Sequence, residues 1–413
     1  MSDPMSPRLP IYLDYNATTP VDPRVFEAMR PYFTEVFGNA ASASHSFGQV
    51  AQDAVIRARN QVAALLNVEQ DERQGAREII WTSGATEGNN LAIKGVAEAY
   101  RDKGRHIITQ TTEHKAVLDP CQRLAGQGCE ITWLPTNRYG RVCAEQVAEA
   151  IRPDTILVSI MYANNETGTI QPVRDIGAVC RARGVFFHSD ATQAVGKIPI
   201  DVHADGIDLL SLSAHKLYGP KGVGALFVRR KGPRVRLAPL IDGGGHERGY
   251  RSGTLNVPGI VGLGAACEIA RHDMHEESRR LSGLRDRLES TILSALERVF
   301  VNGDTFHRLP QVSNLSFAGA DGSSMLRGLD DVAVSSGSAC TSASMQASHV
   351  LRAMGLDDEL AYNSIRFSLG RFTTEAEVDY TAEKVIRMVR SLRNAGSAGN
   401  CEASCATHPA SVK

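Results

Sequence analysis

The chain has 413 residues, which at about 150 residues per domain predicts roughly two to three domains with ample core-forming material. It carries 45 basic and 46 acidic side chains, so its formal net charge is only −1. A charge this small provides no strong field that would draw the protein to nucleic acid or to an anionic membrane. Eight cysteines without a CxxC pair are too few for a disulfide scaffold and favour reduced thiols.

No segment predicts a membrane span or an export signal. The longest informative run without charged side chains, Val332–Leu351, spans 20 residues but contains seven Ser or Thr hydroxyls. The N-terminus lacks both the continuous apolar stretch of a secretory signal and the arginines of a transit peptide. We therefore expect a cytoplasmic protein that contacts neither membrane nor nucleic acid directly.

Two helices are predicted near the N-terminus. Asp22 can cap the first, Pro23 suits its first turn, and Phe26, Met29 and Phe33 recur on one stripe. The apolar positions predicted to be buried by the second helix are Ala51, Ala54, Val55, Ala58, Val62 and Leu65.

From Asp22 to about Arg229, short apolar runs alternate with helix-length segments. This alternation predicts an α/β fold whose mostly parallel sheet is covered by helices on both faces. The candidate strands are 78–82, 106–109, 131–134, 156–161, 185–187, 209–212 and 225–228. Ligands of open α/β sheets bind at the carboxyl ends of the strands, so residues that follow these runs are the candidate site.

The first such stretch, residues 82–87, reads TSGATE and joins a strand to a helix. Backbone N–H groups at a helix N-terminus favour a bound phosphate, although a capped helix start would also explain the pattern. The chain contains neither a complete Walker A motif nor a GxGxxG motif, so nucleotide binding is disfavoured.

Two more strands are followed by charged side chains. Asp190 comes after the run 185–187, and Lys216 comes after the run 209–212. Alone, the aspartate would be a helix cap and the lysine a solvated loop residue. Together with the phosphate cup, our name for the strand-to-helix stretch 82–87, they match a pyridoxal phosphate site. In such a site a carboxylate keeps the pyridine nitrogen protonated and a lysine forms an imine.

Nine motifs in order carry a resemblance to a known family. They are YLDYNATTP from Tyr12, TSGATEGNNLAIKG from Thr82, TEHKAVL from Thr112, ANNETG from Ala163, DATQAVGK from Asp190, SAHKLYGPKG from Ser213, GGGHERGYRSGT from Gly243, SSGSACTSAS from Ser335 and SIRFSLGR from Ser364. Over about residues 10–393 the chain resembles the IscS/NifS-type cysteine desulfurases, within the class V aminotransferase-like group of fold type I pyridoxal phosphate enzymes.

The resemblance implies two domains. The large cofactor-binding domain would span residues 24–270, and the small domain would combine 1–23 with 271–393 and carry a mobile catalytic loop at about 333–346. Residues 394–413 have little to bury, so we expect a disordered tail. The tail residues Cys401, Cys405 and His408 are expected to be incidental rather than metal ligands.

The resemblance also implies roles for individual residues. Lys216 would form the imine and shuttle protons, Asp190 would pair with the pyridinium nitrogen, His114 would stack on the ring, and Gln193 would hydrogen-bond the phenolic oxygen. The implied phosphate ligands are Ala85, Thr86, Ser213, His215 and, from the other subunit of a homodimer, Thr254. The implied ligands of the substrate carboxylate are Asn165, which also contacts the cofactor, and Arg366.

Cys340 is the residue that selects the reaction. Its small, polar neighbours permit exposure and movement, whereas a buried filler cysteine prefers apolar neighbours. The resemblance implies that its thiolate takes sulfur from L-cysteine, leaving L-alanine and a persulfide on Cys340. His114 is a candidate for deprotonating Cys340, and the sequence leaves open which group removes that proton. Transfer to acceptor proteins would then serve iron–sulfur cluster assembly and tRNA thiolation. Cys340 could also be a transient metal ligand in a [2Fe–2S] cluster shared with a scaffold partner.

Three alternatives remain at this point: a pyridoxal phosphate-dependent aminotransferase, a selenocysteine lyase-like enzyme, and a non-catalytic sulfur-transfer subunit. The chain departs from the family pattern at Asp321–Ser324 and at Met345–Ser348, where a usual proline is lost. Its tail after Arg393 does not resemble the family's scaffold-docking segment, so scaffold delivery is less well supported than desulfuration.

A basic cluster follows the last candidate strand and consists of Arg229, Arg230, Lys231, Arg234 and Arg236. Such a run is usually a solvated face. By resemblance it borders the region where sulfur acceptors dock, which would suit an acidic partner surface.

Overall fold

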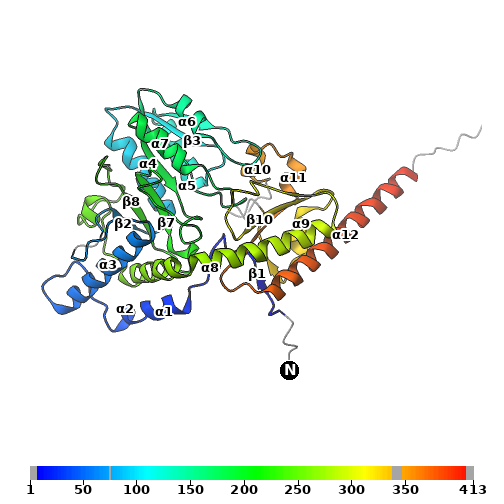
Figure 1. Cartoon of the computed structure of the whole chain (residues 1–413), viewed down its shortest axis with the longest axis horizontal. Coiled ribbons are helices and arrows are strands. Elements are labelled where there is room, and N and C mark those ends of the chain that lie inside the picture. Colours follow the sequence, from blue (N-terminus) through cyan, green and yellow to red (C-terminus); the bar gives the residue numbers. More distant parts are fainter. Residues whose placement is uncertain (1–6, 74–75, 337–346, 406–413) are drawn as a thin grey trace, which may run out of the picture.

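The computed structural model describes residues 7–73, 76–336 and 347–405, with side chains up to residue 395. It consists of a large body built on a central sheet and a smaller body, joined by one long helix, α8 (Val257–Ala295) (Figure 1). Cys340 and most of the loop predicted at 333–346 lie outside the described residues.

The central sheet has seven strands in the order β2-β8-β7-β6-β5-β3-β4. They are β2 (Ile79–Thr82), β3 (His106–Gln110), β4 (Glu130–Leu134), β5 (Thr155–Ser159), β6 (Phe186–Asp190), β7 (Leu209–Ser213) and β8 (Gly224–Val228). Only β8 runs antiparallel to its neighbours in this sheet. All seven predicted strands are present and the predicted fold class is confirmed, although β6 and β7 extend far enough to include Asp190 and Ser213.

Helices cover both faces of this sheet because neighbouring strand residues point to opposite sides. Ile107, Leu157 and Leu209 pack in one core with α4 (Ala85–Ala99) and α5 (Lys115–Ala125). The next residue of each strand packs in a second core with α3 (Ser46–Leu65), α7 (Val173–Arg183) and the start of α8. The remaining elements of this body are α1 (Pro23–Met29), α2 (Pro31–Thr34), α6 (Ala144–Ala150), and the short 3-10 helices η1 (Ala214–Lys216) and η2 (Glu247–Gly249).

The first predicted helix begins where expected, but of the three residues predicted on its stripe only Met29 is buried. Asp22 caps α1 by accepting from the backbone N–H of Arg24. Val25 and Met29 are buried, whereas Phe26 is 54% exposed and Phe33 is 59% exposed. Helical spacing shows which residues share one face of the helix, but the face that packs in the core with α8 is the one that carries Val25 and Met29. All six residues predicted to be buried on α3 are buried.

The smaller body has its own core, which includes Leu13, Phe317, Phe367 and Val385. Its antiparallel sheet has the order β12-β10-β9, and a second, parallel pair joins β1 to β11. Its elements are β1 (Ile11–Tyr12), β9 (Val299–Val301), β10 (Val312–Phe317), α9 (Gly322–Gly328), β11 (Val332–Ala333), α10 (His349–Ala353), α11 (Asp358–Tyr362), β12 (Ser364–Ser368) and α12 (Glu375–Cys405).

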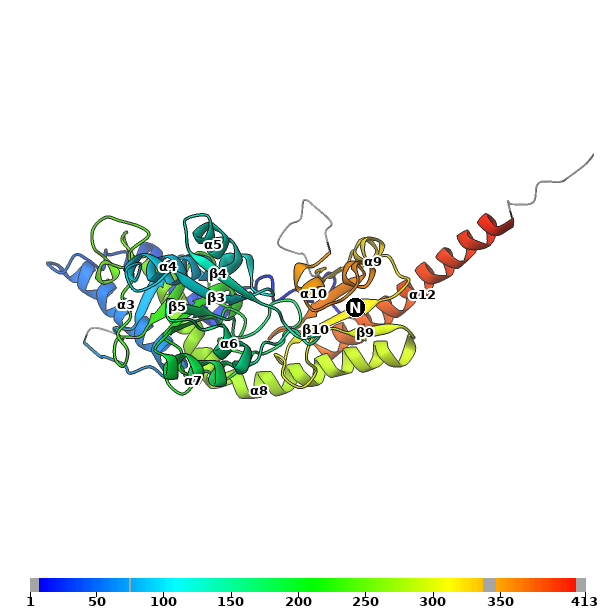
Figure 2. The same ribbon diagram turned by 90° about the horizontal axis from the view of Figure 1, so that it is seen from above.

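Helix α8 contributes to the cores of both bodies and runs along both in Figure 2. Ala270 packs in the core of the large body, and Leu281 packs in the core of the small body. We therefore propose to keep the division into residues 24–270 and residues 1–23 with 271–393. Among the described residues, no helix combines the length and apolarity needed to cross a membrane.

Helix α12 differs from the sequence expectation, because it stays helical to Cys405 although the composition predicts disorder from residue 394. Its earlier turns are fixed by the burial of Val385 and Val389. Extending a formed helix costs far less free energy than starting one, so the backbone helix can continue beyond these turns. The C-terminal part of α12 projects away from the small body (Figure 2).

Candidate active site

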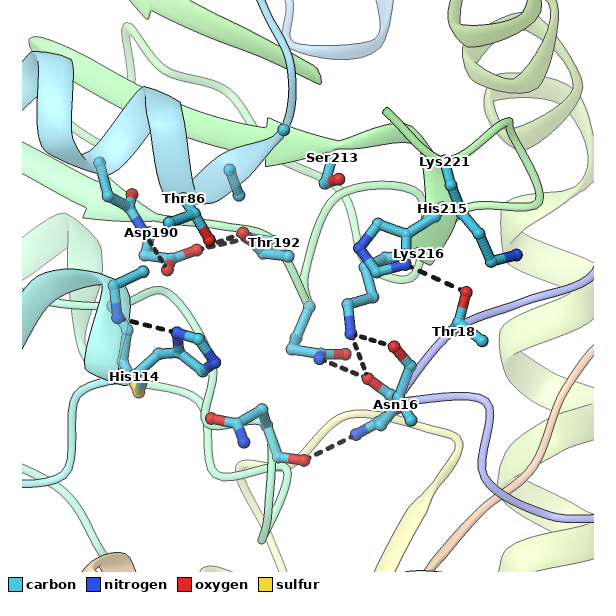
Figure 3. Close-up of a pocket in the computed structure, with 18 of the residues that line it drawn as sticks. Asn16, Thr18, Thr86, His114, Asp190, Thr192, Ser213, His215, Lys216 and Lys221 are labelled. Carbon is cyan, nitrogen blue, oxygen red and sulfur yellow. Dashed lines mark hydrogen bonds between the residues drawn. The ribbon is translucent and has the colours of Figure 1, made fainter. Parts of the chain in front are cut away.

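A cavity of about 590 Å³ lies at the carboxyl ends of the central strands, on the side that faces the small body. It brings together the predicted site residues Ala85, Thr86, His114, Asn165, Asp190, Gln193, Ser213, His215, Lys216 and Arg366, most of which are drawn in Figure 3. Thr254 does not line it, and Cys340 lies outside the described residues. Apart from Arg366 on β12, these residues belong to the large body.

One end of the cavity suits a phosphate group. Helix α4 begins at Ala85, and its N-cap residue Gly84 provides no side-chain cap for the first backbone N–H groups. A Cβ at Gly84 would lie 3.6 Å from the hydroxyl oxygen of Ser213, so this hydroxyl sits beside the start of the helix. N–H groups, the helix dipole and nearby hydroxyls together favour an anion.

Two basic residues complete this end. Burial, together with the charges of Lys216 and Lys221, lowers the pKa of His215 to about 4. His215 is therefore neutral at pH 7, and its Nδ1 lies 3.1 Å from the hydroxyl of Thr18. Lys221, which the sequence analysis did not assign, lines the cavity and supplies positive charge there (Figure 3).

Glu87 is the one acidic residue of the first turn of α4, and its charge is balanced by Arg251. The Arg251 Nε lies 2.9 Å from Glu87 Oε1, and the Ser83 backbone N–H donates to Glu87 Oε2 at 2.8 Å. Burial acts to raise the pKa of Glu87, but the hydrogen bonds from Arg251 and Ser83 outweigh it and lower that pKa. The Glu87 carboxylate is therefore paired with Arg251 and Ser83, which offsets its negative charge beside the phosphate cup.

The cavity is also lined by the carboxylate of Asp190, the last residue of β6. Asn89 Nδ2 donates to its Oδ2 at 2.6 Å, and the Thr192 backbone N–H donates to its Oδ1 at 3.0 Å. The Thr192 hydroxyl also contacts Asp190 (Figure 3). These donors fix the orientation of the Asp190 carboxylate. Sequence reasoning missed Asn89, although it follows Ala85 by one helical turn and so faces the same side.

Lys216 reaches toward the N-terminal segment. Its Nζ donates to the backbone carbonyls of Asn16 at 2.5 Å and of Ala17 at 2.7 Å. Gln193 Nε2 donates to the same Asn16 carbonyl at 3.0 Å, and Asn16 Nδ2 donates to the Asn165 carbonyl at 3.1 Å (Figure 3). Asn16 therefore connects three predicted site residues, a role that no local pattern around it indicates.

His114 is the N-cap residue of α5, where its Nδ1 accepts from the backbone N–H of Ala116 at 3.0 Å. An imidazole nitrogen that accepts carries no proton, so the neutral ring has its proton on Nε2. The local fold thus sets both the ring's place in the cavity and its tautomer (Figure 3).

Arg366 is held by two oxygens. Its Nη1 donates to the Asn165 carbonyl at 2.9 Å, and its Nη2 lies 2.6 Å from Asp14 Oδ1. Its Nε has no hydrogen-bond partner among the described residues. A planar fork oriented in this way can bind a carboxylate in the cavity. Asp14, which the sequence analysis did not assign, also accepts from the Ser335 hydroxyl at 2.9 Å.

One residue of the predicted basic cluster, Arg229, does not lie on the surface. Its side chain is buried, its Nε lies 2.9 Å from Asp208 Oδ1, and its Nη2 donates to the Val202 carbonyl at 2.8 Å. Arg229 therefore connects the end of β8 to the segment that precedes β7 rather than forming part of a surface. Within the described ranges, no group of three His, Cys, Asp or Glu side chains could hold a metal ion.

The chemistry of this donor set fits pyridoxal phosphate. The start of α4, without a side-chain cap, suits the phosphate, the buried Asp190 suits a protonated ring nitrogen, and Lys216 supplies an amine for the aldehyde. An α/β sheet with this set at its carboxyl edge defines the class of pyridoxal phosphate-dependent enzymes.

Comparisons with known proteins agree with this class. The aminotransferase class-V family model matches residues 11–381. The curated cysteine desulfurase IscS of Anaeromyxobacter dehalogenans (strain 2CP-C) is 57% identical over 386 residues, which cover 94% of each chain. The cysteine desulfurase IscS of Escherichia coli O139:H28 is 56% identical over 389 residues and 94% of each chain.

Solved structures give the same result. A NifS-like protein superimposes with a TM-score of 0.84 at 39% identity, covering 92% of this chain and 99% of its own. A structure described as SspA in complex with cysteine has a TM-score of 0.77 at 39% identity and covers 88% of this chain and 100% of its own. The chain belongs to the aminotransferase class-V family and, within it, to the IscS-type cysteine desulfurases, which confirms the resemblance found in the sequence.

Proposed function

We propose that this protein removes sulfur from L-cysteine, producing L-alanine and a persulfide on Cys340. The observation that carries the proposal is that one cavity holds the Lys216 amine and the Arg366 guanidinium, as a pyridoxal phosphate enzyme acting on an amino acid requires. Relatives at 56% and 57% identity that bear the name cysteine desulfurase support the choice of reaction.

The described flanks of the Cys340 segment support its role. Before the segment, the Ser335 backbone carbonyl accepts from the Arg366 backbone N–H at 2.7 Å. After it, the Ser348 hydroxyl donates to Glu166, and His349 Nε2 lies 3.0 Å from the Glu113 carbonyl. Both flanks therefore lie beside cavity-lining residues, Arg366 on one side and His114 on the other, which supports a role for Cys340 in the reaction.

Each residue of the cavity has a proposed role. Ala85, Thr86, Ser213, His215 and Lys221 hold the phosphate of pyridoxal phosphate, Asp190 keeps its ring nitrogen protonated, and His114 and Gln193 fix the ring. When bound, the cofactor withdraws electrons from the substrate and weakens its Cβ–Sγ bond. Arg366 and Asn165 hold the substrate carboxylate, and Lys216 moves protons at Cα.

Atoms and electrons balance in the proposed sulfur transfer. The Cys340 thiolate bonds to the substrate sulfur as the Cβ–Sγ bond breaks, and Cβ gains hydrogen to become the methyl group of alanine. L-Cysteine and the Cys340 thiol are thus converted to L-alanine and a persulfide without an external oxidant or reductant.

We further propose a homodimer in which Thr254 completes the phosphate site of the partner subunit. Thr254 is exposed and lies outside its own cavity, although it is three residues from Arg251, which neutralises Glu87 at the phosphate end. Phe37 and Phe47 support an apolar contact with a second copy, because their rings are 5.7 Å apart and are 64% and 53% exposed.

The persulfide is proposed to pass to acceptor proteins in the cytoplasm for iron–sulfur cluster assembly and tRNA thiolation, with Cys340 as a transient ligand of a shared [2Fe–2S] cluster. The exposed Lys231, Arg234 and Arg236 would attract an acidic acceptor surface.

The decisive experiment incubates the cofactor-loaded protein with L-cysteine, measures alanine and keto acids, and maps the persulfide by mass spectrometry. Alanine in step with persulfide on Cys340, without keto acid, supports the proposal. Keto acid without sulfur transfer would identify an aminotransferase instead.

A further inference from the structure

Tyr218 lies at the boundary between the two bodies in a buried, charged setting. It follows Lys216 by two residues, is fully buried, and adopts a left-handed backbone conformation with φ of 64°. Its backbone N–H donates to the Thr19 hydroxyl at 2.9 Å, and its carbonyl accepts from the Asp22 backbone N–H at 2.9 Å. A tyrosine held in this unfavourable conformation is fixed by its surroundings.

The ring of Tyr218 is contacted by two cations. Arg371 Cζ lies 4.2 Å from the ring centroid, and Lys197 Nζ lies 4.5 Å from it. Burial lowers the pKa of Lys197 to about 8, so Lys197 remains mostly protonated at pH 7. The Tyr218 hydroxyl oxygen also accepts from the Arg371 backbone N–H at 2.5 Å. A cation over the face of an aromatic ring is attracted by the negative potential of that face, and the attraction is stronger where the pair is buried.

Two carboxylates balance these cations. Arg371 Nη1 lies 2.6 Å from Asp22 Oδ2, and Arg371 Nε lies 2.8 Å from Glu277 Oε2. Glu277 also lies 3.9 Å from Lys197 Nζ. We call Asp22, Lys197, Tyr218, Glu277 and Arg371 the boundary cluster, because Lys197 and Tyr218 belong to the large body and Arg371 follows β12 of the small body.

Helix α8 fixes the segment that carries Arg371. Glu277 lies between Ala270, which packs in the large core, and Leu281, which packs in the small core. One turn later, Arg280 donates to the Arg371 and Thr373 carbonyls at 2.8 Å each. A Cβ on Gly370 would lie 2.2 Å from the Tyr15 ring, so only glycine permits this close approach.

The chain positions of the cluster relate it to the cavity. Arg371 is five residues beyond Arg366, and Tyr218 is two residues beyond Lys216. The contact between Arg371 and Tyr218 therefore joins the backbone that carries the carboxylate ligand to the backbone that carries the catalytic amine, across the boundary between the bodies.

We propose that the boundary cluster sets the distance between Arg366 and Lys216, and that Arg371 is a positioning residue for the substrate amino acid. The inference rests on the proposed function, because Arg366 binds a substrate carboxylate only there. An amino acid must reach Lys216 with its amine and Arg366 with its carboxylate, so a looser boundary lowers substrate affinity while cofactor binding, confined to the large body, is unchanged.

The test compares Arg371→Gln with wild type in the cofactor-loaded, full-length protein. The KM for L-cysteine should rise about tenfold, as expected for a displaced binding group, with kcat changed far less. The dissociation constant of L-alanine, measured from the visible absorbance of the bound cofactor, should rise by a similar factor. The cofactor content and the unliganded spectrum should not change.

Arg287→Gln is the matched control. Arg287 also pairs with two carboxylates, Asp379 at 2.6 Å and Glu375 at 3.3 Å, but these contacts lie wholly within the small body. Arg371→Lys, which keeps a charge near Tyr218, should recover part of the affinity. If Arg371→Gln does not fold, Lys197→Met tests the same ring from its other side and should shift both constants in the same direction.

Equal L-alanine affinities in Arg371→Gln, Arg287→Gln and wild type would overturn the inference, as would loss of cofactor from Arg371→Gln. A wild-type protein that binds L-alanine but produces none from L-cysteine would instead contradict the proposed function, while the L-alanine titration would still decide the role of Arg371.

Discussion

Asp14 forms an ion pair with Arg366 at 2.6 Å, although the two residues are 352 positions apart in the chain. Asp14 also accepts a hydrogen bond from the Ser335 hydroxyl, so one carboxylate contacts both the guanidinium and the segment after β11. A fork held in this way needs little reorganisation to receive a substrate carboxylate.

Arg366→Lys tests this arrangement. Lysine keeps the charge but cannot bind Asp14, the Asn165 carbonyl and a carboxylate through one planar group, so the KM for L-cysteine should rise about tenfold or more. Steady-state kinetics measure the effect. Arg308→Lys is the control, since Arg308 is comparably buried and pairs with Glu289 at 2.7 Å away from the cavity. An unchanged KM for Arg366→Lys would refute the assignment.

Lys216→Ala should abolish L-cysteine turnover and remove the visible absorption band of the bound cofactor, because the amine near Asn16 and Ala17 is lost. The absorption spectrum and alanine production measure this outcome. Lys384→Ala, which removes a cation paired with Asp330 on the small body, should keep both properties. Wild-type turnover by Lys216→Ala would show that another group supplies the amine.

Cys340→Ala should still bind L-cysteine, as judged from the absorbance of the cofactor, but produce little alanine and no persulfide. Binding requires the cavity residues alone, whereas sulfur transfer requires the thiolate. Cys143, an exposed thiol in the described part of the chain, provides the control, and Cys143→Ala should behave as wild type. Persulfide found chiefly on another cysteine would contradict the mechanism.

Cofactor retention should depend on association if Thr254 completes the partner's phosphate site. Dilution below the dimer dissociation constant should release pyridoxal phosphate, and Thr254→Ala should lose it at higher protein concentrations than wild type. Sedimentation and fluorescence of the released cofactor follow the two events together. A monomer that retains the cofactor tightly would argue against the proposed dimer site.

Glu166 should make the folding free energy depend on pH. Burial raises its pKa from 4.5 to about 7, although Ser348 and the Arg366 charge act to lower it. The folded state therefore favours the neutral acid. Stability from this group is fully present below the unfolded pKa and is lost as pH rises through 7, by up to about 3 kcal/mol.

Glu166→Gln removes that ionisation but keeps an oxygen that can accept from Ser348. Its stability relative to wild type should increase between pH 5 and pH 8 and level off above the folded pKa of about 7. Denaturant unfolding at a series of pH values measures the difference in the free energy of unfolding between the two proteins. The difference near pH 4.5, where ionisation of Glu166 contributes little to it, serves as the reference. A difference that does not change with pH would show that folding does not raise the pKa of Glu166.

Much of the fold was predictable from local pattern. Apolar runs such as 106–109 and 209–212 predicted strands of the central sheet, because a strand buried on both faces is apolar along its whole length. Once a parallel sheet is predicted, Asp190 and Lys216 must fall at the same edge, since parallel strands end on one side. The cavity residues of the large body were therefore accessible from sequence order, and resemblance supplied their roles.

The tertiary structure alone decided which residues hold these groups in place. Asp14 and Asn16 contact Arg366 and Lys216 only because the N-terminal segment lies between the two bodies, and no spacing along the chain reports a contact over 352 positions. Phe26 and Arg229 show the same limit, since helical period and charge could not reveal which surface α8 covers or which guanidinium finds a buried carboxylate. Secondary structure follows from short-range sterics and periodicity, whereas these partners depend on how distant elements pack.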